Sequence, residues 1–86
     1  MRTSQEMVLP LQTAFLMVTC EAGYEYDVIE QIRSISGIKE AHRTSGTYDI
    51  FCSIEAATIE SLREIIEQKI RKTHHVIATT TLIKSY

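Results

Sequence analysis

Apolar and polar residues follow the spacing of strands in four short segments and the spacing of helices in two longer ones. Segments rich in β-branched and aromatic residues predict strands at residues 13–20, 38–44, 48–55 and 75–85. Apolar residues three or four positions apart form one face of a helix, and this spacing occurs in residues 24–35 and 58–72. The predicted order is therefore strand, helix, strand, strand, helix, strand.

Residues that favour helix caps mark the end of the first predicted helix and the start of the second. Gly37 follows the first helix and suits the position after its C-cap, and Thr58 suits the N-cap of the second. The first apolar stripe consists of Val28, Ile32 and Ile35, with Ile29 beside it. The second consists of Ile59, Leu62, Ile66 and Ile70. Both helices therefore have one face suited to packing on a sheet.

The order of elements predicts an α+β fold. Right-handed crossovers around a central hairpin give a four-stranded antiparallel sheet in the order 4-1-3-2, with both helices on one face. This is the ferredoxin-like βαββαβ arrangement. Residues 1–12, which include the only proline, Pro10, are predicted to form an N-terminal arm, and residues 13–86 the domain.

The central strands are apolar on both faces, although two helices cover only one face of a sheet. The uncovered face is predicted to expose Phe15, Met17, Phe51 and Ile77. An open apolar patch of this kind usually marks an interface, so we expect a homodimer that packs sheet to sheet. The alternative is that the apolar residues of the arm fold over this face.

Composition and charge narrow the class of protein. The chain has 86 residues, 44% of them hydrophobic and 23% charged, which is typical of one folded domain. A net charge of −2 argues against direct DNA binding, because phosphate contact needs a basic face. No apolar run is long enough for a membrane span, and no secretory signal is visible. We therefore expect a cytoplasmic protein in which Cys20 and Cys52 are reduced thiols.

Three segments together resemble the effector domain of the Lrp/AsnC transcription regulators, also called the RAM domain. They are Ile35-Ser36-Gly37-Ile38-Lys39-Glu40-Ala41, Ser45-Gly46-Thr47-Tyr48-Asp49-Ile50 and Ile77-Ala78-Thr79-Thr80-Thr81-Leu82-Ile83. The resemblance implies dimers that assemble into octamers or decamers and bind an amino-acid effector between dimers. Two features depart from the family. Only twelve residues precede the first strand, too few for a helix-turn-helix domain, and His74-His75 stands where the family tends to have glycine. Histidine tolerates a positive φ less well than glycine, so we expect a different turn there.

The strand order brings the end of the first strand close to the starts of the third and fourth. A carboxylate at Asp49 suits the ammonium group of an amino acid, and backbone amides near the preceding turn suit its carboxylate. The candidate ligand residues, to which the resemblance also points, are Gly46, Thr47, Tyr48, Asp49, Thr79 and Thr81. Structural alternatives stay open. Asp49 can cap the adjacent turn, Tyr48 can be a core or interface ring, and the threonines suit any strand.

Catalytic and metal-binding alternatives have weaker signals. Cys20, His74 and His75 lack the spacing of a metal motif, so we expect no metal and no cofactor. His42, Asp49 and His75 offer an acid–base set for a small dimeric α+β barrel enzyme of the monooxygenase or isomerase type, but no nucleophile or phosphate motif accompanies them. An ACT-like regulatory domain shares the strand order and is a further alternative.

Together these patterns predict a stand-alone amino-acid-sensing module rather than an enzyme. Its ligand would change its oligomeric state or act on a partner, such as a full-length Lrp/AsnC regulator.

Overall fold

The structure, a computed structural model, describes residues 11–84. Residues 1–10 of the predicted N-terminal arm lie outside the described residues. Ser85 and Tyr86 lie outside them as well. The elements in chain order are β1 (Gln12–Cys20), α1 (Glu25–Arg33), β2 (Ile38–Arg43), β3 (Ile50–Ala56), α2 (Ile59–Glu64), a π-helical turn η2 (Ile65–Ile70) and β4 (Val76–Lys84). All predicted elements are present, and their ends differ from the prediction by a few residues.

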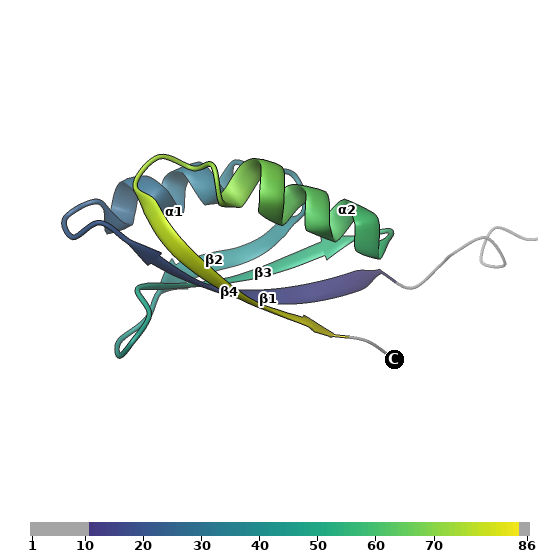
Figure 1. The fold of residues 1–86 in the computed structure, drawn as a ribbon, viewed down its shortest axis with the longest axis horizontal. Coiled ribbons are helices and arrows are strands. Elements are labelled where there is room, and N and C mark those ends of the chain that lie inside the picture. The colour runs from purple at the N-terminus through teal and green to yellow at the C-terminus, as the bar shows by residue number, and fades with distance from the viewer. Residues whose placement is uncertain (1–10, 85–86) are drawn as a thin grey trace, which may run out of the picture.

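The four strands form one antiparallel sheet in the order β2-β3-β1-β4. This is the predicted order read from the opposite edge. Both helices lie on the same side of the sheet (Figure 1). The fold is therefore the ferredoxin-like arrangement expected from the sequence.

The core lies between the sheet and the two helices. Alternate residues of β1 point to it, since side chains on a strand alternate between faces. Leu16 and Val18 are fully buried and pair with Cys52 and Ile50 of β3. The helices contribute fully buried side chains from their predicted stripes, namely Val28, Ile32, Leu62 and Ile70.

The first helix ends earlier than predicted. Its C-cap is Ser34, so Gly37 is not the residue after the C-cap but part of the turn into β2. Gly37 has φ +100, and a Cβ there would lie 2.9 Å from Ile65 Cδ1 and 3.0 Å from the Glu55 carbonyl oxygen. The glycine is needed because the turn packs directly against β3 and η2 and has a left-handed conformation.

The second helix begins as predicted and ends in an unexpected way. The Thr58 hydroxyl accepts a hydrogen bond of 3.0 Å from the Ser61 amide, which confirms the N-cap. Beyond Glu64 the turns widen, and the Arg71 amide donates to the Ile66 carbonyl five residues earlier, at 2.9 Å.

The wider turns of η2 explain why the second apolar stripe stays buried. In an α-helix each step of four residues rotates a side chain about 40° past its predecessor. A wider turn reduces this drift. Leu62, Ile66 and Ile70 therefore all face the sheet, with exposed fractions of 5% or less.

Candidate functional site

Three strand ends meet at one end of the sheet, as predicted. The Asp49 amide donates to the Val18 carbonyl at 3.0 Å, which joins the start of β3 to the end of β1. The Glu21 amide donates to the His75 carbonyl at 3.0 Å, which joins the end of β1 to the turn before β4. The predicted residues Gly46 to Asp49 therefore lie beside these ends, and Thr79 pairs with Val18 close to them. Thr81 lies further along β4, where it pairs with Leu16, and the predicted residues do not all share one face.

The Asp49 carboxylate holds the end of β1 in place. Its Oδ2 accepts a hydrogen bond of 3.0 Å from the Cys20 amide. Cys20 lies two residues beyond Val18, which is the last β1 residue paired with β3, and the pairing with β4 shifts register between Thr19 and Cys20. The carboxylate supplies an acceptor where the strand ladder has ended, which a partly buried amide requires. The structural role of Asp49 thus differs from the turn cap considered from the sequence.

The loop between β2 and β3 presents backbone groups to solvent. The Thr44 hydroxyl donates to the Tyr48 carbonyl at 2.8 Å, and the Thr44 amide donates to the Asp49 carbonyl at 2.9 Å, which closes the loop. Gly46 has φ +112, and both Gly46 and Thr47 are exposed. Neither of their amides donates a hydrogen bond to another described residue. These amides are in reach of a ligand from solvent.

The threonines of β4 divide between the two faces of the sheet. Thr79 and Thr81 pair with Val18 and Leu16, so they are half-buried on the side that carries the helices. Thr80 faces the opposite way, and its hydroxyl lies 3.3 Å from the Tyr48 hydroxyl. The structure thus brings Tyr48 to Thr80 and separates it from Thr79 and Thr81. Sequence reasoning missed Thr80 because alternation along β4 does not reveal which face carries the helices.

A second cluster of polar and aromatic side chains lies where α1 begins. His75 adopts φ +74, in the left-handed region that glycine occupies more readily than histidine. Its Nδ1 pairs with a Glu21 carboxylate oxygen, and its ring stacks on Tyr24 with centroids 3.6 Å apart. Histidine is among the non-glycine residues enriched at positive φ. Contacts with the ring and the carbonyl of His75 hold the turn after β1 against the turn before β4.

The residues weighed for catalysis and metal binding are dispersed. His42 lies beside Phe51 and Glu40, Asp49 binds the Cys20 amide, and His75 binds Glu21. Within residues 11–84 no group of three metal-ligating side chains is gathered, and no helix is both long and apolar enough to cross a membrane.

Both thiols are buried on the helix side of the sheet. Burial raises the pKa of the Cys52 thiol to about 12. The pKa of the Cys20 thiol is also raised, first by burial and then by the negative charge of Asp49. Leu16 is the pairing partner of Cys52, and Cys20 lies four residues further along β1. At about 3.3 Å per residue this separation is too long for a disulfide, so both cysteines are free, as expected.

The side of the sheet without helices carries an apolar patch, called here the open face and formed by Phe15, Met17, Phe51 and Leu82. Met17 pairs with Phe51, Phe15 pairs with Leu82, and the two phenylalanine rings stack with centroids 5.9 Å apart. Phe15 is 36% exposed and Leu82 is 67% exposed. Ile77 is 63% exposed at the register shift of β4. Three of the four residues predicted for this face thus share it, Ile77 lies at its end, and Leu82 was not anticipated.

The family of the chain follows from its match to a sequence model of the Lrp/AsnC ligand binding domain over residues 13–84. The chain belongs to the Lrp/AsnC ligand-binding domain family. The fold, the strand order and the two helices agree with this assignment. The resemblance inferred from the sequence motifs is therefore confirmed.

Relatives of this Lrp/AsnC domain include regulators and an enzyme. An uncharacterized HTH-type transcriptional regulator of Pyrococcus furiosus is 31% identical over 74 residues, which are 83% of this chain and 49% of that protein. A homocitrate synthase of Saccharolobus islandicus is 36% identical over 69 residues, which are 79% of this chain and 15% of the enzyme. The chain thus spans about half the length of the regulator and a small part of the enzyme.

Solved structures share the fold of this Lrp/AsnC domain. The structure described as FFRP-DM1 superposes with a TM-score of 0.82 at 34% identity and covers 86% of this chain and 99% of that one. A Neisseria meningitidis transcriptional regulator described as an L-Met complex superposes with a TM-score of 0.79 at 12% identity and covers 100% of this chain and 56% of that one. The second likeness is one of fold alone.

Proposed function

We propose that this Lrp/AsnC domain is an amino-acid-sensing module. It binds a small amino acid between dimers, and binding changes its oligomeric state or its association with a partner regulator. The observation that carries the proposal is the open face next to the end of the sheet where Asp49 lies. The open face mediates assembly, and the end of the sheet that carries Asp49 offers a ligand site that assembly can complete.

Dimerisation is supported by the exposure of the open face. Phe15, Met17, Phe51 and Leu82 cover neighbouring strands, and only part of each side chain is buried. Burying apolar surface contributes about 25 cal/mol for each Å², so a second copy packed on this face would stabilise both. The Tyr48 and Thr80 hydroxyls lie at the edge of the same face, where an interface tolerates polar groups.

Amino-acid binding is supported by the chemistry at the end of the sheet. The Asp49 carboxylate uses Oδ2 to hold Cys20, which leaves Oδ1 as an acceptor for an ammonium group. The amides of Gly46 and Thr47 suit a carboxylate. Thr79 and Thr81, on the helix side of β4, are proposed to contact the ligand from that side. The L-Met described for the Neisseria regulator is a ligand of the same class.

The mechanism is thermodynamic linkage. An amino acid that contacts two dimers binds one assembly state more tightly than another, and it shifts the equilibrium by that difference in affinity. The assemblies proposed for this chain are dimers, and octamers or decamers built from them. Two kinds of partner follow from the relatives, namely a full-length Lrp/AsnC regulator by mixed assembly, or an enzyme, since a homocitrate synthase contains a similar segment.

The test is the mass in solution, measured by light scattering with and without L-methionine and a pool of the other amino acids. The expected result is at least a dimer, with a larger mass or a narrower distribution when the effector is present. Phe51→Glu should give a monomer, because a charge on the open face opposes its burial. A monomeric wild-type chain at micromolar concentration, or a mass that no amino acid changes, would reject the proposal.

A further inference from the structure

The loop between β2 and β3, residues 44–49, projects from the sheet on the side away from both helices (Figure 1). This is the side of the open face, so the loop stands at one end of that face. The Thr44 hydroxyl donates to the Tyr48 carbonyl at 2.8 Å, and the Asp49 amide donates to the Val18 carbonyl at 3.0 Å. The backbone at Tyr48 is therefore held by Thr44 on one side and by the end of β1 on the other.

The Tyr48 side chain connects this loop to the open face. Its hydroxyl lies 3.3 Å from the hydroxyl of Thr80, which comes 32 residues later in the chain. Thr80 pairs with Met17, and Met17 pairs with Phe51, so the tyrosine ends in the same cross-strand row as two residues of the open face. A tyrosine side chain has only two torsion angles, so its hydroxyl follows the position of its backbone.

The contact between the two hydroxyls is sensitive to the position of the loop. A separation of 3.3 Å is longer than the usual range of about 2.5–3.0 Å for hydrogen bonds between hydroxyls. Thr80 is exposed and Tyr48 is half-buried, so in the single chain water can pair with either hydroxyl. A second copy packed on the open face removes this water. A hydroxyl without a partner then carries the full cost of its desolvation.

We propose that the loop between β2 and β3 controls the affinity of the dimer through Tyr48. In the conformation described here the Tyr48 and Thr80 hydroxyls pair with each other, so a second copy can cover both. A shifted loop leaves both hydroxyls unpaired in the interface and weakens the dimer. Tyr48 is thus a positioning residue. The inference rests on the dimer of the proposed function and not on its amino-acid ligand.

The first test is the dimer dissociation constant of the full chain, measured by analytical ultracentrifugation over a dilution series. Tyr48→Phe and Thr80→Val each leave one hydroxyl without its partner, and each should weaken the dimer at least about fivefold. The double variant removes both hydroxyls, and replacing both members of a hydrogen-bonded pair by apolar groups is nearly neutral. Its dissociation constant should therefore lie closer to the wild type than that of either single variant. A side chain that only filled space would give additive losses instead.

The second test changes the loop without touching the hydroxyl pair. Thr44→Val releases the Tyr48 carbonyl and should weaken the dimer of the wild-type chain, whereas Thr44→Ser keeps the hydroxyl and should preserve it. In the Tyr48→Phe, Thr80→Val background the effect of Thr44→Val should largely disappear. Thr58→Val is the matched control. It also removes a hydroxyl bonded to a backbone amide, at 3.0 Å, but at the start of α2, so it should lower the unfolding free energy and leave the dissociation constant unchanged.

The outcomes separate this inference from the proposed function. Single variants that dimerise like the wild type, additive losses in the double variant, or equal effects of Thr44→Val in both backgrounds would overturn control by the loop. An amino-acid-dependent mass change in that case would leave the proposed function standing. Non-additive losses in a dimer whose mass no amino acid changes would support the loop and reject amino-acid sensing. A wild-type chain that stays monomeric would reject both.

Discussion

The Asp49 carboxylate has a structural contact and a proposed ligand contact, and two substitutions separate them. In the wild-type chain the Cys20 amide lies 3.0 Å from Asp49 Oδ2. Asp49→Asn keeps a side-chain oxygen that can accept from this amide, but it removes the negative charge. Asp49→Ala removes both. Comparison of the two variants therefore distinguishes the loss of a strand anchor from the loss of an ammonium-binding group.

The expected magnitudes follow from the hydrogen bond. Replacing a charged acceptor by a neutral one costs about 1 kcal/mol of unfolding free energy, whereas leaving the partly buried Cys20 amide unpaired costs about 1–3 kcal/mol. A domain of this size has a total stability of roughly 4–13 kcal/mol. We therefore expect both variants to fold, with Asp49→Asn the more stable.

The assays are urea unfolding at matched protein concentrations, because dimerisation contributes to apparent stability, and calorimetric titration with L-methionine. Asp49→Asn should lose at least about tenfold in affinity, because a charged hydrogen bond to the ammonium disappears, and it should lose only about 1 kcal/mol of unfolding free energy. An Asp49→Asn variant that binds like the wild type would refute the role of the charge. An Asp49→Ala variant as stable as the wild type would refute the anchoring of β1.

Two further predictions concern stability. Gly37→Ala should lower the unfolding free energy by about 2–4 kcal/mol, because an L-residue is strained at φ +100 and the added methyl would lie 3.0 Å from the Glu55 carbonyl oxygen; an unchanged urea midpoint would contradict this packing. For Cys52, burial raises the pKa from 9.0 to about 12, so the unfolded chain loses the thiol proton first and stability should fall as pH rises above 9. Cys52→Val should lose less stability than the wild type as pH rises above 9. If circular dichroism gave the same loss of stability with pH for both proteins, the Cys52 thiol would not be its cause.

Much of the fold was predictable because its signals are local. The stripe of Leu62, Ile66 and Ile70, the cap at Thr58 and the alternation along β1 each depend on residues close in sequence, and the structure agrees with all three. The ends of elements were less predictable. The first helix ends at Arg33 rather than at residue 35. The C-terminal end of this helix depends on how the loop that contains Gly37 packs on β3 and η2. No local sequence pattern encodes that packing.

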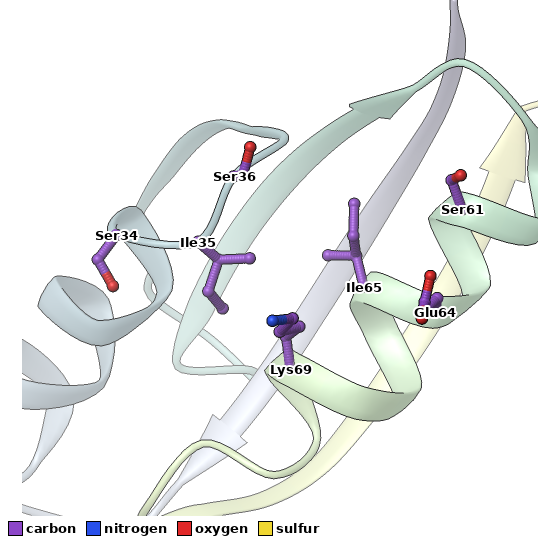
Figure 2. A pocket seen from close by; sticks show the side chains of 7 residues that line it. All are labelled: Ser34, Ile35, Ser36, Ser61, Glu64, Ile65 and Lys69. Atoms are coloured by element: carbon purple, nitrogen blue, oxygen red, sulfur yellow. The ribbon is translucent and has the colours of Figure 1, made fainter.

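The candidate sites likewise combine features that the sequence predicts with features that only tertiary packing decides. The sequence indicated that Asp49 lies at a strand end and that Phe15, Met17 and Phe51 face away from the helices. It gave no sign that the Cys20 amide would occupy one oxygen of that carboxylate. A groove lies between the turn after α1 and the helical segments α2 and η2 (Figure 2). Its lining side chains come from two segments with no shared motif, and only the packing of these segments brings them together.

The sequence by itself determined the order of strands and helices, the pairing of two helices with one sheet, and the surplus of apolar residues that leaves one face open. These depend on periodicity and composition. The tertiary structure alone decided which face each β4 residue occupies, since the pairing of β1 with β4 joins residues about sixty positions apart and shifts by one residue at Thr19 and Cys20. Because neighbouring strand residues point to opposite faces, that register puts Thr80 and Leu82 on the open face and Thr79 and Thr81 on the side of the helices.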